Sequence, residues 1–381
     1  MYEESFAGET AQAFVYERTG NSAVIWRCFS HGTKAQIPQQ IGDCPVRAIA
    51  PYAFSAHMEE RTLRRGLENG NLHLYVPEVL GGSAHWIAGG SGIRACKKET
   101  SAQSPKGQQA DREQTGIREI PALCGDALEE VVFPGTLQRV GRYCFYDCAR
   151  LHSLTFYGET TDWGSGVFTR CHRVRNLRVH TDMEGRSSLK EVLDELPEEI
   201  FVEYYVPDEC SGLTYARAQL VFPEFYEEGV ENTPARILET HVHGSGMSYR
   251  NCFQGRRFDF GQYDALFSRA QVLEREQIVY RMVLGRLRTA VALSEKARSV
   301  YETYLCTHGK RIAQELLKQG DTQEFCWLIE RLRGIGVSEW ESLVQELGRE
   351  AAGLHAGEAV SYLMNLGAGM PRKTKRRRLE L

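Results

Sequence analysis

The segment THVHGSG holds the residues whose types and spacing come nearest to a reactive site in this sequence. His241 and His243 alternate along it, so in an extended conformation both imidazoles could point to one side and bind a zinc ion. Glu239 precedes them, and Cys252 or Asp259 could complete the ligand set. A metal ion held in this way would support a metal-dependent hydrolase.

The His-x-His pattern is common, however, and here it lacks a placed third ligand and a general base. We therefore favour histidines that pack or hydrogen-bond in a loop between helices, with no metal site and no cofactor. The sequence contains no G-x-S-x-G, Walker loop, H-E-x-x-H or dinucleotide fingerprint. The runs Gly90-Ser91-Gly92 and Gly244-Ser245-Gly246 lack the lysine of a phosphate-binding loop. These observations predict a protein that is not an enzyme.

The charges divide the chain into an acidic body and a basic tail. The formal net charge is −4, and residues 371–381 contribute +5 of it, which leaves −9 for the first 370 residues. Such a tail could bind nucleic acid or anionic lipid through salt-sensitive contacts. We favour a solvated, disordered end, and the acidic body argues against nucleic acid as the main partner.

The cysteines and the apolar runs bear on location. The sequence has 11 cysteines and no C-x-x-C pair, which favours reduced thiols over a disulfide framework. The start, MYEESFAGETAQAF, lacks the basic and apolar regions of a signal peptide. No run approaches the ~18 apolar residues of a membrane span. We therefore expect a cytoplasmic protein without a membrane span.

The elements that position side chains are clearest between Leu128 and Val179, where the sequence repeats itself every 23 residues. Aligned positions share their residue type, as in the pairs Val131/Leu154, Phe133/Phe156, Gly141/Gly164, Phe145/Phe168 and Cys148/Cys171. A fixed short period predicts a solenoid, in which each unit buries its apolar face against its neighbours.

Within each predicted strand of the solenoid, the residues between the inward apolar positions should face the concave surface. If the solenoid binds a protein, these residues are the first candidates for the contact. The alternative is that they are only solvated strand positions. The six candidates are Glu130, Val132, Ser153, Thr155, Asn176 and Arg178.

Flanking segments complete the first predicted domain, residues 1–205. Gly20-Asn21 marks the turn of a β-hairpin that would cap the solenoid. A polar stretch at about 94–116 predicts a disordered insert. Residues 187–196 predict a short helix, and residues 199–205 predict a last strand.

From about Val206 the apolar period changes to that of helices, which predicts an all-helical domain over 206–370. Thr233-Pro234 should open one helix, Ser294 another, and Asp321 with Glu324 a third, with Gly320 as a C-terminal stop. Ser338 with Glu341 forms a further capping box. An aromatic cluster at the junction is interpreted as a packing seam rather than a groove; it comprises Tyr204, Tyr205, Tyr215, Phe222, Phe225 and Tyr226.

The repeat LEEVVFPGTLQRVGRYCFYDCARLHSLTF resembles the BspA-like class of leucine-rich repeats, which is found mostly in bacteria. The resemblance extends over roughly residues 12–205, and the helical half is loosely similar to the helix pairs of ankyrin-type repeats. It implies an α+β two-domain protein: a short, β-rich leucine-rich-repeat solenoid followed by an all-helical array of antiparallel helix pairs. By analogy with such scaffolds, the expected function is non-enzymatic binding of a protein partner whose identity the sequence does not reveal. The alternatives are the metal-dependent hydrolase centred on His241 and His243, and nucleic-acid association through the basic tail.

Overall fold

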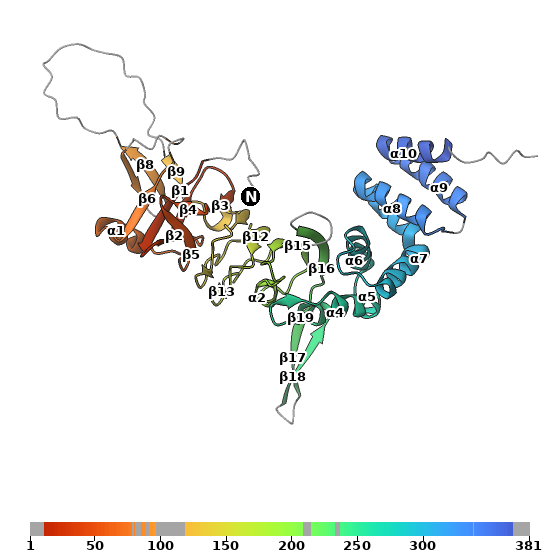
Figure 1. The fold of residues 1–381 in the computed structure, drawn as a ribbon, viewed down its shortest axis with the longest axis horizontal. Coiled ribbons are helices and arrows are strands. Elements are labelled where there is room, and N and C mark those ends of the chain that lie inside the picture. Colours follow the sequence, from red (N-terminus) through yellow and green to blue (C-terminus); the bar gives the residue numbers. More distant parts are fainter. Residues whose placement is uncertain are drawn as a thin grey trace, which may run out of the picture. The chain divides into compact units, whose positions relative to one another are not determined.

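The computed structural model describes residues 11–77, 80, 85–88, 91–96, 119–208, 215–232, 237–337 and 339–368. The chain divides into two compact units, Met1–Glu274 and Arg275–Leu381 (Figure 1). The predicted insert at 94–116 lies outside the described residues from position 97 onward, and its first three positions end a strand, β8. The basic tail and the cap at Ser338 also lie outside the described residues.

One sheet of the first unit contains the predicted hairpin. The strands β1 (Ala13–Thr19) and β2 (Ser22–Phe29) pair antiparallel around Gly20, whose φ of 60° favours glycine. The order of this sheet is β13-β11-β5-β2-β1-β6, and β4 pairs with β5. Its other strands are β4 (Gln40–Ile41), β5 (Cys44–Ile49), β6 (Leu72–Tyr75), β11 (Arg139–Val140) and β13 (Asp162–Trp163).

Smaller elements lie between β5 and β10 in the order of the chain. They are the helix α1 (Glu60–Glu68), the three-stranded sheet β7 (His85–Ala88), β8 (Gly92–Cys96) and β9 (Glu119–Pro121), and the turn η2 (Gly125–Ala127). Ile93 and Ile120 pack with Leu63 and Leu72 in one buried cluster. The strands β8 and β9 thus pack against the N-terminal hairpin, whose Val15 and Phe29 belong to the same cluster.

The second sheet holds the strands of the repeat. Its order is β16-β15-β14-β12-β10-β3, with bounds β3 (Lys34–Gln36), β10 (Glu130–Val132), β12 (Ser153–Tyr157), β14 (Asn176–His180), β15 (Ile200–Pro207) and β16 (Tyr215–Phe222). The strands from β3 to β15 run parallel, and β16 pairs antiparallel with β15. Val131 lies opposite Leu154, which lies opposite Leu177, so the 23-residue period of the sequence is the register of the sheet.

The apolar side of this sheet faces a column of phenylalanines. Phe145 stacks on Phe54 at 5.4 Å between ring centroids, on Phe133 at 6.2 Å and on Phe168 at 5.7 Å. None of these four side chains is more than 4% exposed. Because Phe54, Phe145 and Phe168 come from successive repeats, the column joins each repeat to the next.

Backbone hydrogen bonds join the turns of successive units, and a carboxylate ends the series. Phe145 N donates to Val167 O at 3.1 Å, one unit further along. In the next unit Gly166 N and Phe168 N donate instead to the two carboxylate oxygens of Glu195, at 2.9 and 3.1 Å. Glu195 follows α2 (Leu189–Asp194), the predicted short helix, so this helix closes the stack of turns.

The glycines of the repeat permit this close approach. A Cβ on Gly141 would lie 2.4 Å from Pro51 N, and one on Gly164 would lie 2.3 Å from Arg142 N. Both neighbours are backbone atoms and cannot rotate away. The glycine repeated at this position is therefore a steric requirement of stacking.

We expect Gly164→Ala to lower the free energy of unfolding of the first unit by about 1–3 kcal/mol, because the methyl group forces the turns apart. Gly135→Ala is the matched control, since a Cβ there meets nothing nearer than a Tyr157 ring atom at 3.8 Å. The free energy of unfolding of both variants is measured by urea unfolding, followed by hydrogen exchange of β10–β14. Equal effects of the two substitutions would contradict the steric explanation.

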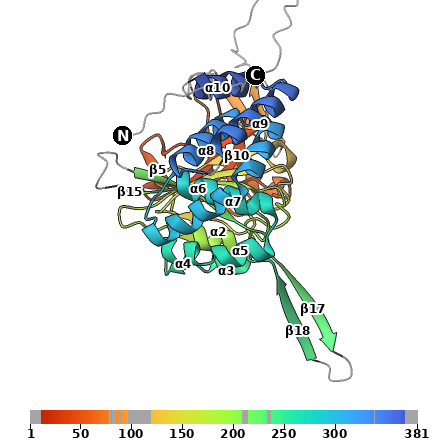
Figure 2. The same ribbon diagram turned by 90° about the vertical axis from the view of Figure 1, so that its right-hand side faces the viewer.

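The prediction of an all-helical domain from Val206 was wrong for the strands that lie between residues 215 and 258. β16 extends the repeat sheet, and β17 (Tyr226–Asn232) and β18 (Ile237–His243) form a hairpin where a helix from Thr233-Pro234 was expected. The physical reason is pairing: β15 offers an open edge, and Ala218, Leu220 and Phe222 bury alternate positions against it. In both views the hairpin projects away from the other elements of its unit (Figures 1 and 2).

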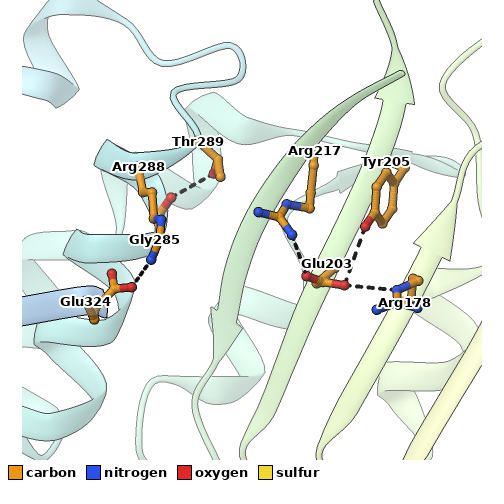
Figure 3. Close-up of polar contacts among 8 residues, drawn as sticks. All are labelled: Arg178, Glu203, Tyr205, Arg217, Gly285, Arg288, Thr289 and Glu324. Atoms are coloured by element: carbon orange, nitrogen blue, oxygen red, sulfur yellow. Dashed lines mark hydrogen bonds and ion pairs between the residues drawn. The ribbon is translucent and has the colours of Figure 1, made fainter. Parts of the chain in front are cut away.

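The first unit ends with short elements: α3 (Gly246–Arg250), β19 (Phe253–Gln254), β20 (Arg257–Phe258), α4 (Phe260–Ala265) and α5 (Phe267–Leu273). The second unit is helical: α6 (Glu276–Arg288), α7 (Glu295–Gln319), α8 (Thr322–Gly334), α9 (Trp340–Gly353) and α10 (Gly357–Ala368). Ser294 and Asp321 cap α7 and α8 as predicted, and Gly320 ends α7 with a φ of 73°. Arg288 of α6 pairs with Glu324 of α8 (Figure 3).

Candidate functional site

The six predicted contact residues lie together on the outward side of the parallel strands. Glu130, Ser153 and Asn176 form one row across β10, β12 and β14. Val132, Thr155 and Arg178 form the next row. We call this surface, with its continuation onto β3 and β15, the strand face. The alternation of the repeat was therefore sufficient to predict which residues share it.

Accessibility differs from strand to strand across the strand face. Asn176 and Arg178 are exposed, and Glu130, Val132 and Ser153 are half-buried. Thr155 is 8% exposed, which leaves it little area for a partner. The end of the face at β14 is thus the more accessible one.

An ion-pair network extends the second row beyond the predicted residues. Glu203 of β15 lies opposite Arg178 and accepts from its Nε at 2.9 Å. The other carboxylate oxygen accepts from Arg217 Nη1 of β16, also at 2.9 Å (Figure 3). One carboxylate of β15 thus joins an arginine of β14 to an arginine of β16.

A third row consists of stacked rings. The His180 ring lies between Tyr157 and Tyr205, at centroid distances of 4.7 and 4.4 Å and interplanar angles of 15° and 10°. Tyr215 of β16 meets His180 edge-on at 6.3 Å. Burial, with a contribution from Arg178, lowers the pKa of His180 to about 4, so the imidazole is neutral at pH 7.

Sequence reasoning missed Glu203, Arg217 and the ring row. Tyr157 and His180 stand 23 residues apart in the repeat, so the period itself could have identified them as neighbours. Arg217 could not be found this way, because the antiparallel return of β16 brings it to Glu203.

The histidines of the hydrolase hypothesis lie on the strand β18, not in a loop between helices. His243 is stacked on Tyr226 at 4.4 Å, and its Nε2 lies 3.0 Å from Glu228 Oε2. The side chain of Glu239 lies outside the described part. Within the described ranges, no group of three or more His, Cys, Asp or Glu side chains could hold a metal ion.

The other proposed ligands have structural roles instead. Asp259 accepts from Gln262 N at 2.9 Å as the N-cap of α4. Cys252 is 2% exposed and donates to Ser248 O at 3.6 Å. Neither side chain is positioned to join the histidines of β18, and this alternative has no support.

Four residues of the predicted aromatic seam lie on the repeat sheet and divide between its two sides, whereas Phe225 follows β16 and Tyr226 lies on β17. Tyr204 and Phe222 are buried against Phe258, at 5.6 and 5.9 Å, as a seam within the first unit. Tyr205 and Tyr215 belong to the opposite side, with the ring row. The alternation of side chains along a strand separates neighbours in the sequence in this way.

The repeated cysteines pack inside the turns. Cys148 is fully buried and Cys171 is 2% exposed, and their thiols donate to Phe54 O at 3.3 Å and Phe145 O at 2.9 Å. Burial raises the pKa of both thiols, that of Cys171 to about 12. They function as packing residues.

Of the helices that the structure describes, none has the length and apolarity to span a bilayer.

Comparison with known proteins confirms the resemblance for part of the chain. Residues 121–188 match the family model described as BspA type leucine rich repeat region (6 copies). The crystal structure of a leucine-rich repeat protein from T. pallidum is similar at 17% sequence identity, covering 51% of this chain and 80% of that one, with a TM-score of 0.18. No curated protein matches the chain.

Proposed function

From the BspA-type leucine-rich repeats of residues 121–188, we propose that this chain is a non-enzymatic scaffold that binds another protein through its strand face. We interpret the parallel strands as the concave side of a short solenoid, and the helices after Arg275 as an array of antiparallel pairs. Repeat architectures of this kind bind through extended concave surfaces. The step from architecture to binding is an analogy.

One observation carries the proposal: the outward side chains of β12, β14, β15 and β16 hold one another in place. Glu203 is fixed by Arg178 and Arg217, and the ring of His180 is fixed by Tyr157 and Tyr205. A surface ordered before binding loses less conformational entropy when a partner arrives. Tyrosine and arginine are also the residues that contribute most to binding at interfaces.

Site-specific photo-cross-linking in cells that express the protein tests the proposal. The cross-linker replaces Asn176 on the strand face or, as the control, the exposed Glu191 on α2. We expect a protein adduct from position 176 that position 191 does not form. Identical adducts from the two positions, or none from position 176, would reject the strand face as the binding surface.

The captured partner is then purified and its Kd for the full chain measured. We expect Arg178→Glu to weaken binding by about tenfold, because it removes the contact and repels Glu203. Glu191→Arg should leave the Kd unchanged. Unchanged affinity with Arg178→Glu would show that the cross-link reported proximity without binding.

A further inference from the structure

The turns on the other side of the repeat hold two tyrosines in a backbone conformation that favours glycine. The φ of Tyr52 is 58° and that of Tyr143 is 52°. One repeat after Tyr143 the equivalent residue is Gly166, with a φ of 63°. A bulky residue in this left-handed region is strained, and such strain persists where the side chain has a role. The tyrosine side chains are therefore the feature to explain.

Their rings form an aromatic surface at the turns. Tyr52 and Tyr143 stack at 5.4 Å and 24°, and Tyr146 meets both edge-on, at 6.3 and 6.0 Å. His57 meets Tyr146 edge-on at 5.0 Å. All three tyrosines are half-buried, so each also presents part of its ring to solvent. We call these rings, with Arg142, the turn patch.

The polar residues beside the rings include one arginine that forms no ion pair with a described residue. Both oxygens of Asp147 are engaged, one by His57 Nε2 at 3.2 Å and the other by Arg170 Nε at 3.3 Å. Arg142 directly precedes Tyr143 in the chain, and its carbonyl oxygen accepts a hydrogen bond from Tyr52 N at 3.3 Å. Its side chain is exposed, and no carboxylate of the described residues forms an ion pair with it.

We propose that the turn patch is a second docking surface, and that its occupant is a peptide segment of a partner protein with carboxylates beside an apolar side chain. The tyrosine rings provide apolar area at low entropic cost, and Arg142 provides a bidentate donor for a carboxylate. The patch lies on the turns, apart from the outward strand positions of the strand face. It would let one solenoid hold two partners or two segments of one partner.

Fluorescence anisotropy with the purified full chain and three labelled synthetic decapeptides tests this proposal. Each peptide has a leucine–phenylalanine core, flanked by glutamate, glutamine or lysine. We expect the glutamate peptide to bind at least about tenfold more tightly than the glutamine peptide, and the lysine peptide not to bind. Absence of binding by all three peptides, or equal binding, would overturn the proposal.

Two substitutions assign the binding to the turn patch. Tyr143→Gly and Arg142→Gln should each weaken the glutamate peptide by about tenfold. Tyr143→Gly should leave the melting temperature unchanged or raise it, because glycine relieves the left-handed strain. Arg178→Gln, on the strand face, is the control and should not change the affinity.

Three further results would count against the turn patch. Peptide binding that survives both Tyr143→Gly and Arg142→Gln would place the occupant elsewhere. Heparin that binds as tightly as the glutamate peptide, and is lost with Arg142→Gln alone, would show a general anion surface in place of a peptide site. Loss of binding with a lower melting temperature in Tyr143→Gly would reduce the tyrosine to a packing residue.

Discussion

Arg250→Met is expected to lower the free energy of unfolding of the first unit by at least about 3 kcal/mol, because it leaves several buried acceptors without a donor. Arg250 is 2% exposed and donates only to backbone carbonyl oxygens. These belong to Leu193, Leu196, Glu198, Pro223 and Gly246, at 2.5 to 3.2 Å. These residues lie in or just after α2, directly after β16 and at the start of α3, so one guanidinium joins three segments.

The charge of Arg250 is retained despite burial. Loss of hydration lowers the pKa of Arg250 to about 10, which still leaves it protonated at pH 7. Its guanidinium also lies 4.9 Å above the ring of Phe225. Arg250→Lys should recover only part of the loss, since a lysine ammonium has three donors where the guanidinium has five.

Denaturant-dependent hydrogen exchange of β15 and β16 measures the effect in the first unit alone. Arg269→Met on α5 is the matched control, because Arg269 is exposed, and we expect a change within about 0.5 kcal/mol. Similar exchange in the two variants would contradict the role assigned to Arg250.

The second large effect is expected for Phe145→Ala, which should destabilise the first unit by about 3–5 kcal/mol. The Phe145 ring is fully buried, and it stacks on Phe54 of the preceding repeat and Phe168 of the following repeat. Its removal opens a cavity that the fixed backbone of stacked turns cannot close. Because repeat units are stabilised by their neighbours, exchange should rise throughout β10, β12 and β14.

Phe145→Leu fills part of the cavity and should cost less than the alanine variant. Tyr226→Ala on the projecting hairpin is the control for loss of an aromatic ring, since Tyr226 is 61% exposed. Chemical unfolding followed by far-ultraviolet circular dichroism compares the three. If protection from hydrogen exchange were lost only near position 145 and kept in β14, coupling between the repeats would be contradicted.

The repeat made much of the first unit predictable. Its period is local information: each unit has the same inward positions because each packs on a copy of itself. The hairpin at Gly20, the short helix before Glu195 and the caps at Ser294 and Asp321 follow equally local rules of turn and cap chemistry. For the same reason the six positions of the strand face were identified as neighbours before the structure was known.

Features that depend on residues distant in the sequence were not predictable. The helix expected at Thr233-Pro234 gave way to the strand β18, because pairing with β17 outweighs a local start signal. Arg250 reaches carbonyl oxygens up to 57 residues away, and nothing in its own segment indicates this. The carboxylate of Glu195 closes the turns only because α2 folds back on the last unit.

The sequence by itself therefore determined the repeat, its register and the side of the sheet on which each residue lies, since alternation and period are properties of neighbouring residues. Only the tertiary structure decided which side chains meet across that surface. It joined Glu203 to Arg217 through the antiparallel strand β16, and it removed Cys252 and Asp259 from the histidines of β18. Contacts of this kind depend on which distant segments of the chain come together in the fold, and short-range sequence patterns do not contain that information.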